Sequence, residues 1–143
     1  MRGPRAARNT LSVSESACKP LNEAHIRTTV LIVDDDPGFI RAAAEMLAAR
    51  GYRVVGQATT ADEAVQECGR LGPDAVLLDV VLPDGNGVTL AETLRAARDR
   101  LNILLTSTDA NAIAPQRLAH SAARGFVPKP ELARTDLDMF FKR

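Results

Sequence analysis

Two groups of carboxylates in this chain could do chemistry together. Asp34, Asp35 and Asp36 follow directly after one apolar run, and Asp79 follows directly after another. Carboxylates that crowd together repel one another unless a hard divalent cation, which prefers oxygen ligands, neutralises them. A Mg²⁺ site is therefore the first hypothesis. A carboxylate held beside such an ion can attack a phosphoryl donor and form an acyl phosphate.

A cation and a hydroxyl would complete such a pocket. Lys129 stands between two prolines, which fix the local backbone and favour an ordered side chain. Its ammonium could offset the charge on transferred phosphoryl oxygens. Thr106 and Ser107 end a further apolar run, and only one of them can face the site because side chains alternate along a strand. Asp36 stands before Pro37, so we expect it to be a helix N-cap rather than a metal ligand.

The elements that would position these side chains alternate regularly along the chain. Apolar runs between turn formers predict buried strands of a parallel sheet, at residues 29–33, 52–58, 75–78, 103–106 and 126–127. Helical periodicity and capping signals predict a helix after each strand. The fourth helix is expected to run from Pro115 to about Ala123. The inner face of the fifth is expected to consist of Ala133, Leu137, Phe140 and Phe141.

This alternation predicts an α/β fold with a five-stranded parallel sheet and five helices on its two faces, joined by right-handed crossovers. The fold class is flavodoxin-like and doubly wound, and its usual five-stranded order is 2-1-3-4-5. In that order the first, third, fourth and fifth strands follow one another across the sheet. The carboxylates, the hydroxyl and Lys129 would then converge at the carboxyl edge of the sheet, where such folds bind ligands.

Composition sets limits on function. The chain has 143 residues, of which 45% are hydrophobic, enough for one compact domain. We expect residues 1–28 to be a flexible leader, because they show no apolar periodicity, and residues 29–143 to be the folded domain. A formal net charge of zero argues against nucleic-acid binding. The chain lacks a long apolar stretch, which argues against membrane contact and export and favours a cytoplasmic protein.

Four segments resemble the receiver domain of two-component response regulators, and they occur in the family's order between residues 29 and 141. They are VLIVDDDP at 30–37, VLLDVVLPDGNG at 76–87, LLTST at 104–108 and GFVPKP at 125–130. The resemblance implies that Asp79 is the phosphoacceptor. It implies that Asp34, Asp35, Asp79 and the backbone carbonyl of Val81 bind Mg²⁺, and that Lys129 bridges to the phosphoryl group.

The resemblance also assigns the switch residues. Family spacing favours Ser107 as the hydroxyl that captures the phosphoryl group, with Thr106 as the alternative. Phe126 matches the aromatic position that swings inward when the hydroxyl is engaged. Phenylalanine is so often buried that an ordinary core role for Phe126 stays equally open.

Partners follow from the same resemblance. A sensor histidine kinase or phosphotransfer protein would supply the phosphoryl group. Since the chain ends directly after the fifth predicted helix, we expect no output domain, and signalling by contact with an unidentified downstream protein. The contact face would comprise the fourth helix, fifth strand and fifth helix, with a candidate patch of Arg117, His120, Arg124, Asp136 and Asp138. Enzymatic activity would be limited to self-phosphorylation from small donors and autodephosphorylation.

Three other interpretations remain. A receiver-like interaction module that is never phosphorylated would have the same fold. A small Mg²⁺-dependent phosphohydrolase would need a general acid, and no acid stands two residues after Asp79, where Val81 is found. A flavodoxin-like nucleotide binder would need a glycine-rich first turn, where this chain has carboxylates instead.

Overall fold

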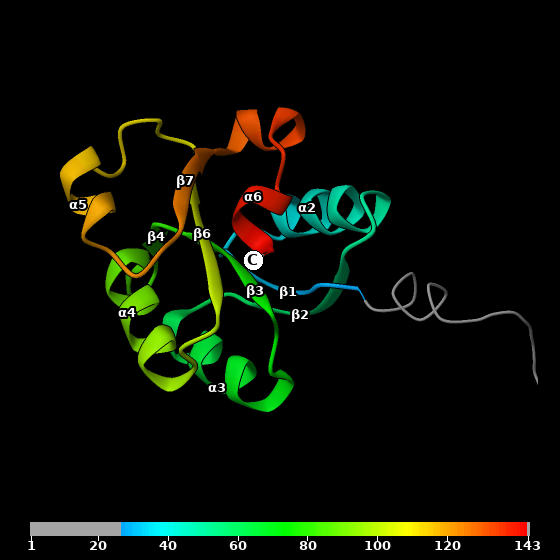
Figure 1. Ribbon diagram of the computed structural model, residues 1–143, viewed down its shortest axis with the longest axis horizontal. Coiled ribbons are helices and arrows are strands. Elements are labelled where there is room, and N and C mark those ends of the chain that lie inside the picture. The colour runs from blue at the N-terminus through cyan, green and yellow to red at the C-terminus, as the bar shows by residue number, and fades with distance from the viewer. Residues whose placement is uncertain (1–26, 143) are drawn as a thin grey trace, which may run out of the picture.

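A computed structural model describes residues 27–142, which form a parallel β-sheet with helices on both faces (Figure 1). The predicted leader falls almost entirely on residues outside this range. The sheet has five strands in the order β2-β1-β3-β6-β7, all of them parallel, which confirms the predicted order and fold class. The strands are β1 Thr29–Val33, β2 Arg53–Ala58, β3 Ala75–Asp79, β6 Asn102–Ser107 and β7 Gly125–Pro128.

The strands send alternate side chains into two separate apolar cores. On one face, Val30 and Ile32 of β1 pack with α2 (Pro37–Ala49) and with the C-terminal segment. On the other face, Leu31 and Val33 pack with α3 (Ala61–Leu71) and α4 (Gly87–Ala97). Because both faces are covered, the central strands are apolar at nearly every position. Within the described range, no helix is long and apolar enough to cross a membrane.

Local capping explains where the helices begin. The Asp36 carboxylate accepts a hydrogen bond from the backbone N–H of Gly38 at 2.9 Å, and Pro37 occupies the first helical position, which confirms Asp36 as the N-cap of α2. The Thr60 hydroxyl accepts from the N–H of Glu63 at 3.0 Å at the start of α3. Both caps lie just after a strand, so each helix leaves the sheet at its carboxyl edge.

The connection between β3 and α4 is ordered. It contains a short antiparallel hairpin, β4 (Val81–Leu82) and β5 (Gly85–Asn86), in which Val81 pairs with Asn86. The side chain of Asn86 then caps α4 by accepting from the N–H of Val88 at 2.7 Å. Val81, two residues after Asp79, is thus held in a hairpin.

The fourth helix is shorter than predicted. It is α5, which runs from Pro115 to Ala119 instead of continuing to about Ala123. The hydroxyl of Ser121 donates to the carbonyl of Leu118 at 2.8 Å and accepts from the N–H of Ala123 at 3.2 Å. These local bonds compete with the hydrogen bonds that would extend the helix.

The prediction of the fifth helix is wrong in its extent. Residues Lys129–Arg134 form a 3-10 helix, η1, and the α-helix α6 covers only Asp138–Phe141. Arg50 donates to the backbone carbonyls of Ala133, near the end of η1, and Thr135, just after it, and the Tyr52 hydroxyl donates to Asp138. These contacts hold the segment against α2 and β2. Of the four predicted inner residues, Leu137 and Phe141 are buried, Phe140 is half-buried and Ala133 is exposed.

Candidate functional site

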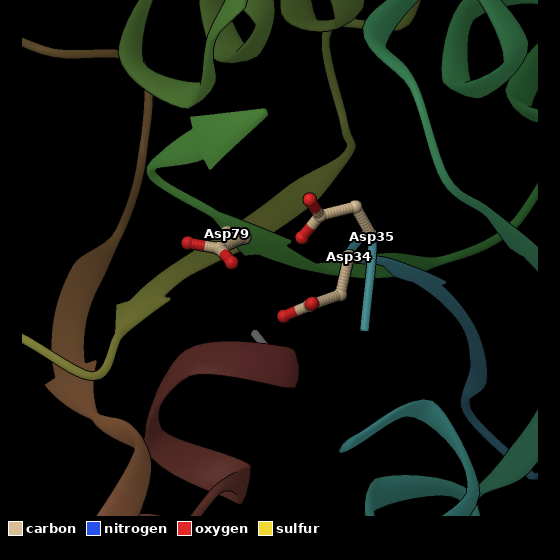
Figure 2. A group of neighbouring side chains, drawn as sticks. All are labelled: Asp34, Asp35 and Asp79. Atoms are coloured by element: carbon tan, nitrogen blue, oxygen red, sulfur yellow. The ribbon is translucent and has the colours of Figure 1, made fainter. Parts of the chain in front are cut away.

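Three carboxylates meet at the carboxyl edge of the sheet. β1 and β3 are paired so that Val33 lies opposite Leu78, which places the next residue of each, Asp34 and Asp79, side by side. Asp34, Asp35 and Asp79 each present an oxygen within 4.8 Å of the others (Figure 2). Asp34 is fully buried, Asp79 is 7% exposed and Asp35 is exposed. Clustered oxygen ligands of this kind suit a hard divalent cation.

The buried carboxylate of Asp34 contacts one backbone amide and one ammonium. Its Oδ1 accepts from the backbone N–H of Asp36 at 2.8 Å. Its Oδ2 lies 2.7 Å from the Nζ of Lys129, but no donor in the described residues is aligned with this oxygen as a hydrogen bond. Burial raises the pKa of Asp34, and the contacts with Lys129 and the Asp36 amide offset that effect only in part. The three carboxylates therefore fit a divalent metal ion.

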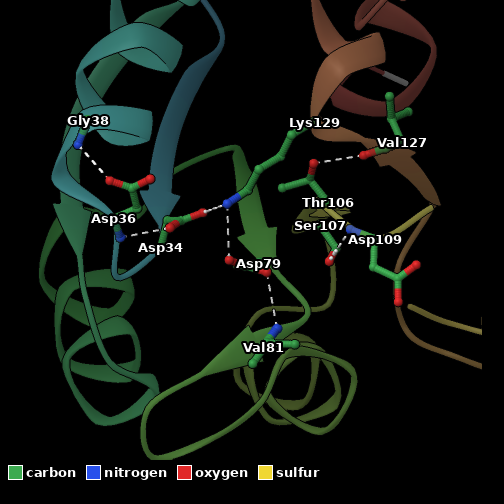
Figure 3. A network of polar contacts seen from close by, with 10 residues as sticks. All are labelled: Asp34, Asp36, Gly38, Asp79, Val81, Thr106, Ser107, Asp109, Val127 and Lys129. Atoms are coloured by element: carbon green, nitrogen blue, oxygen red, sulfur yellow. Dashed lines mark hydrogen bonds and ion pairs between the residues drawn. The ribbon is translucent and has the colours of Figure 1, made fainter. Parts of the chain in front are cut away.

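Lys129 bridges the two buried acids (Figure 3). Its Nζ lies 2.7 Å from Asp34 and 3.3 Å from Oδ2 of Asp79, and it also stands 4.3 Å from the centre of the Phe39 ring. Burial lowers the pKa of Lys129, but its bonds to Asp34 and Asp79 outweigh burial and leave that pKa above its ordinary value. The side chain is therefore a fixed ammonium beside the carboxylates.

Sequence reasoning missed Phe39. The ring belongs to the first turn of α2, immediately after the acidic cluster, and is half-buried. A cation held over an aromatic face is attracted by the ring's quadrupole, so Phe39 helps to orient Lys129. The signal in the sequence that could have found Phe39 was its position three residues after Asp36, at the same edge of the sheet as the acids.

Backbone contacts fix the position of Asp79. Its Oδ1 accepts from the N–H of Val81 at 3.1 Å. The N–H of Gly87 donates to the carbonyl of Val80 at 2.7 Å, and a Cβ at Gly87 would lie 2.2 Å from the carbonyl oxygen of Asp79. Glycine is therefore required for α4 to begin this close to the strand end. The Val81 side chain is 65% exposed, and the metal-binding role of its carbonyl stays a prediction.

The two adjacent hydroxyls make different contacts (Figure 3). Thr106 is fully buried, and its Oγ1 donates to the carbonyl of Val127 at 2.7 Å, which ties β6 to β7. Ser107 accepts from the N–H of Asp109 at 3.2 Å and makes no further hydrogen bond within residues 27–142. The Ser107 hydroxyl therefore retains its proton for another acceptor, which favours Ser107 over Thr106 as the switch residue.

The remaining predicted residues lie outside the carboxylate cluster. Phe126, on β7, is half-buried against the core shared with α3 and α4, a position compatible with both of its predicted roles. In the predicted contact patch, Arg124 donates to the carbonyl of Lys142 at 2.7 Å, and Asp138 accepts from Tyr52. These two residues of the patch brace the C-terminal segment.

The family model for the response regulator receiver domain matches residues 30–139. The chain is 33% identical over 101 residues to the DNA-binding transcriptional activator EvgA of Escherichia coli, covering 71% of this chain and 50% of EvgA. It is 29% identical to the chemotaxis protein CheY of Thermotoga maritima, covering 71% of this chain and 84% of CheY. The chain thus spans about half the length of EvgA.

A solved structure gives the same result for the fold. A response regulator receiver domain protein (CheY-like) from Methanospirillum hungatei has a TM-score of 0.66 and 25% identity, covering 76% of this chain and 86% of that one. The doubly wound fold with clustered acids at its carboxyl edge is that of a receiver. The chain belongs to the response regulator receiver domain family of two-component systems.

Proposed function

We propose that this receiver is a phosphorylation-dependent switch in which Asp79 accepts a phosphoryl group. The observation that supports this proposal is the meeting of three carboxylates with one half-buried ammonium. With the acids ionised, the group has two negative charges in excess, which a divalent cation balances. Mg²⁺ held by Asp34, Asp35, Asp79 and the Val81 carbonyl would neutralise charge on the acids and on the phosphoryl oxygens.

Each residue then has a defined task. An oxygen of Asp79 forms a bond to phosphorus as the bond to the donor's leaving group breaks. Lys129 stabilises the transferred oxygens from a fixed position, so little reorganisation is needed during transfer. Ser107 donates its hydroxyl proton to a phosphoryl oxygen, and Phe126 responds by moving toward the space that Ser107 vacates.

The proposed partners follow from this switch. A sensor histidine kinase or phosphotransfer protein supplies the phosphoryl group. A downstream protein reads the state of the switch on the face formed by α5, β7 and the η1–α6 segment. This face is smaller than the sequence predicted, because the fourth and fifth helices are short.

Intact-protein mass after incubation with acetyl phosphate tests the proposal. We expect a gain of one phosphoryl group with Mg²⁺ and none with a chelator. Asp79→Asn should abolish the gain. Asp36→Asn is the matched control, because it also neutralises an acid, one directly beside the cluster, but asparagine still caps α2. No gain under conditions that phosphorylate another receiver would contradict the proposal and favour an unphosphorylated interaction module.

A further inference from the structure

Asp84 links the segment between β3 and α4 to the N-terminus of another helix, α3. It lies at the tip of the β4–β5 hairpin, between Leu82 and Gly85. Its carboxylate accepts from the backbone N–H groups of Ala61 at 2.7 Å and Asp62 at 3.1 Å, which are the first two residues of α3. The bonds join residues 22 and 23 positions apart in the sequence.

These bonds complete the capping of α3. The first N–H groups of a helix have no partner within the helix. Thr60 supplies an acceptor for Glu63, and Asp84 supplies acceptors for the two preceding groups. The bonds from Ala61 and Asp62 lower the pKa of Asp84, so the carboxylate is charged and also interacts favourably with the positive end of the helix dipole. The hairpin tip is therefore attached to α3 by a charge-assisted pair of hydrogen bonds.

The other end of the hairpin lies at the phosphoryl site. Val81 begins β4, pairs with Asn86, and donates its N–H to Asp79. Of the two residues of β4, only one is fixed by side-chain packing. Leu82 is buried, but Val81 is 65% exposed. An open hollow of about 270 Å³ lies among the hairpin, α3 and α4, and its lining includes Asp62, Val65, Asp84, Thr89 and Thr93. The polar attachment at Asp84 therefore adds to the limited apolar packing of the hairpin tip.

We propose that Asp84 is a positioning residue, which fixes the Val81 carbonyl toward the metal site by tying the hairpin tip to the N-terminus of α3. This inference rests on the proposed function, since it assigns the Val81 carbonyl as a Mg²⁺ ligand. Groups that orient metal ligands from outside the coordination sphere typically contribute about 10–100-fold to metal affinity. We expect Asp84→Ala to weaken Mg²⁺ binding by about 10-fold, at the lower end of that range, because the hairpin keeps its anchor at Leu82.

Two control variants separate positioning from other effects. Thr60→Ala removes the remaining side-chain cap of the same helix without touching the hairpin. Asp62→Asn removes a negative charge at the same place while leaving the backbone N–H that Asp84 binds. If Asp84 positions the carbonyl, neither control should reproduce the loss of affinity.

The experiment is a calorimetric titration of the full-length, metal-free protein and its three variants with Mg²⁺, together with amide hydrogen exchange. Asp84→Ala should bind Mg²⁺ more weakly and exchange faster at Val81 and Asn86, whereas Thr60→Ala and Asp62→Asn should match the unsubstituted protein in both respects. Equal affinity in Asp84→Ala, or an equal loss in either control, would overturn the positioning role alone. Absence of Mg²⁺ binding by the unsubstituted protein would overturn the proposed function as well.

Discussion

At the scale of the residue, the burial of Asp34 has a cost that depends on pH. Burial raises its pKa in the folded state, so between the unfolded and folded pKa values the folded state binds more protons than the unfolded state. Stability from this group is complete below the unfolded pKa and is lost as pH rises through the folded pKa. Asp34→Asn, which can still accept from the Asp36 amide, should therefore unfold less easily than the unsubstituted metal-free protein at neutral pH.

Urea unfolding in a chelator, repeated from acidic to neutral pH, measures this difference. The advantage of Asp34→Asn should shrink as pH falls toward the unfolded pKa of an aspartate, about 3.9. Comparing the two proteins at each pH cancels the contributions of carboxylates remote from Asp34. A variant that is less stable at neutral pH, or a difference independent of pH, would contradict this account of the site.

Substitutions of the two adjacent hydroxyl residues, Thr106 and Ser107, should affect different properties, one the stability and the other the phosphorylation. Thr106→Val removes the buried bond to the Val127 carbonyl and should lower the free energy of unfolding by about 1 kcal/mol. It should leave phosphoryl acceptance largely intact. Ser107→Ala should change stability little but slow phosphorylation by acetyl phosphate, by less than the roughly 10²-fold that loss of a preorganised donor can cost. The reverse pattern would make Thr106 the switch hydroxyl.

The sequence predicted which residues form the site better than how they interact. Asp34, Asp79 and Lys129 stand at the carboxyl ends of β1, β3 and β7, which lie within one stretch of the expected strand order, so topology alone predicted that they lie at one edge of the sheet. Strand alternation could not choose between Thr106 and Ser107, because the choice depends on a hydrogen bond to another strand. The contact between Lys129 and the Phe39 ring depends on side-chain orientation, which local pattern does not encode.

At the scale of the element, Gly87 sets where α4 can begin. A methyl group there would meet the Asp79 carbonyl and force the backbone to shift. Gly87→Ala should lower the free energy of unfolding by about 1–3 kcal/mol, the usual cost of overpacking. Gly69→Ala is the control, since a Cβ at Gly69 in α3 meets nothing within 4 Å, and it should stabilise the protein by about 0.5–1 kcal/mol. Chemical denaturation measures both. Equal effects would contradict the steric argument.

The strands were predicted more accurately than the last two helices for a physical reason. Buried parallel strands are apolar at almost every position, and that signal is local. The end of α5 and the break between η1 and α6 depend instead on hydrogen bonds to Ser121, Arg50 and Tyr52. The apolar spacing of Leu137 and Phe141 correctly indicated burial, but it did not distinguish one continuous helix from two short segments.

At the scale of the whole molecule, both cores are made from residues between Val30 and Phe141 of the described chain. Thr28 also belongs to the folded part, because its carbonyl accepts from the N–H of Arg53 at 2.9 Å. We therefore expect deletion of residues 1–26 to leave the melting temperature and phosphoryl acceptance unchanged. Thermal unfolding and intact mass of the shortened protein test this. Loss of cooperative unfolding would show that the leader contributes to the fold.

The site of phosphorylation is the central claim, and borohydride trapping tests it most directly. Reduction of an aspartyl phosphate converts that residue to homoserine, which peptide mass spectrometry locates. After treatment with acetyl phosphate and Mg²⁺, we expect homoserine at position 79 and at neither position 34 nor position 35. Homoserine at one of the other acids, or at none, would contradict the assignment of Asp79 as the phosphoacceptor.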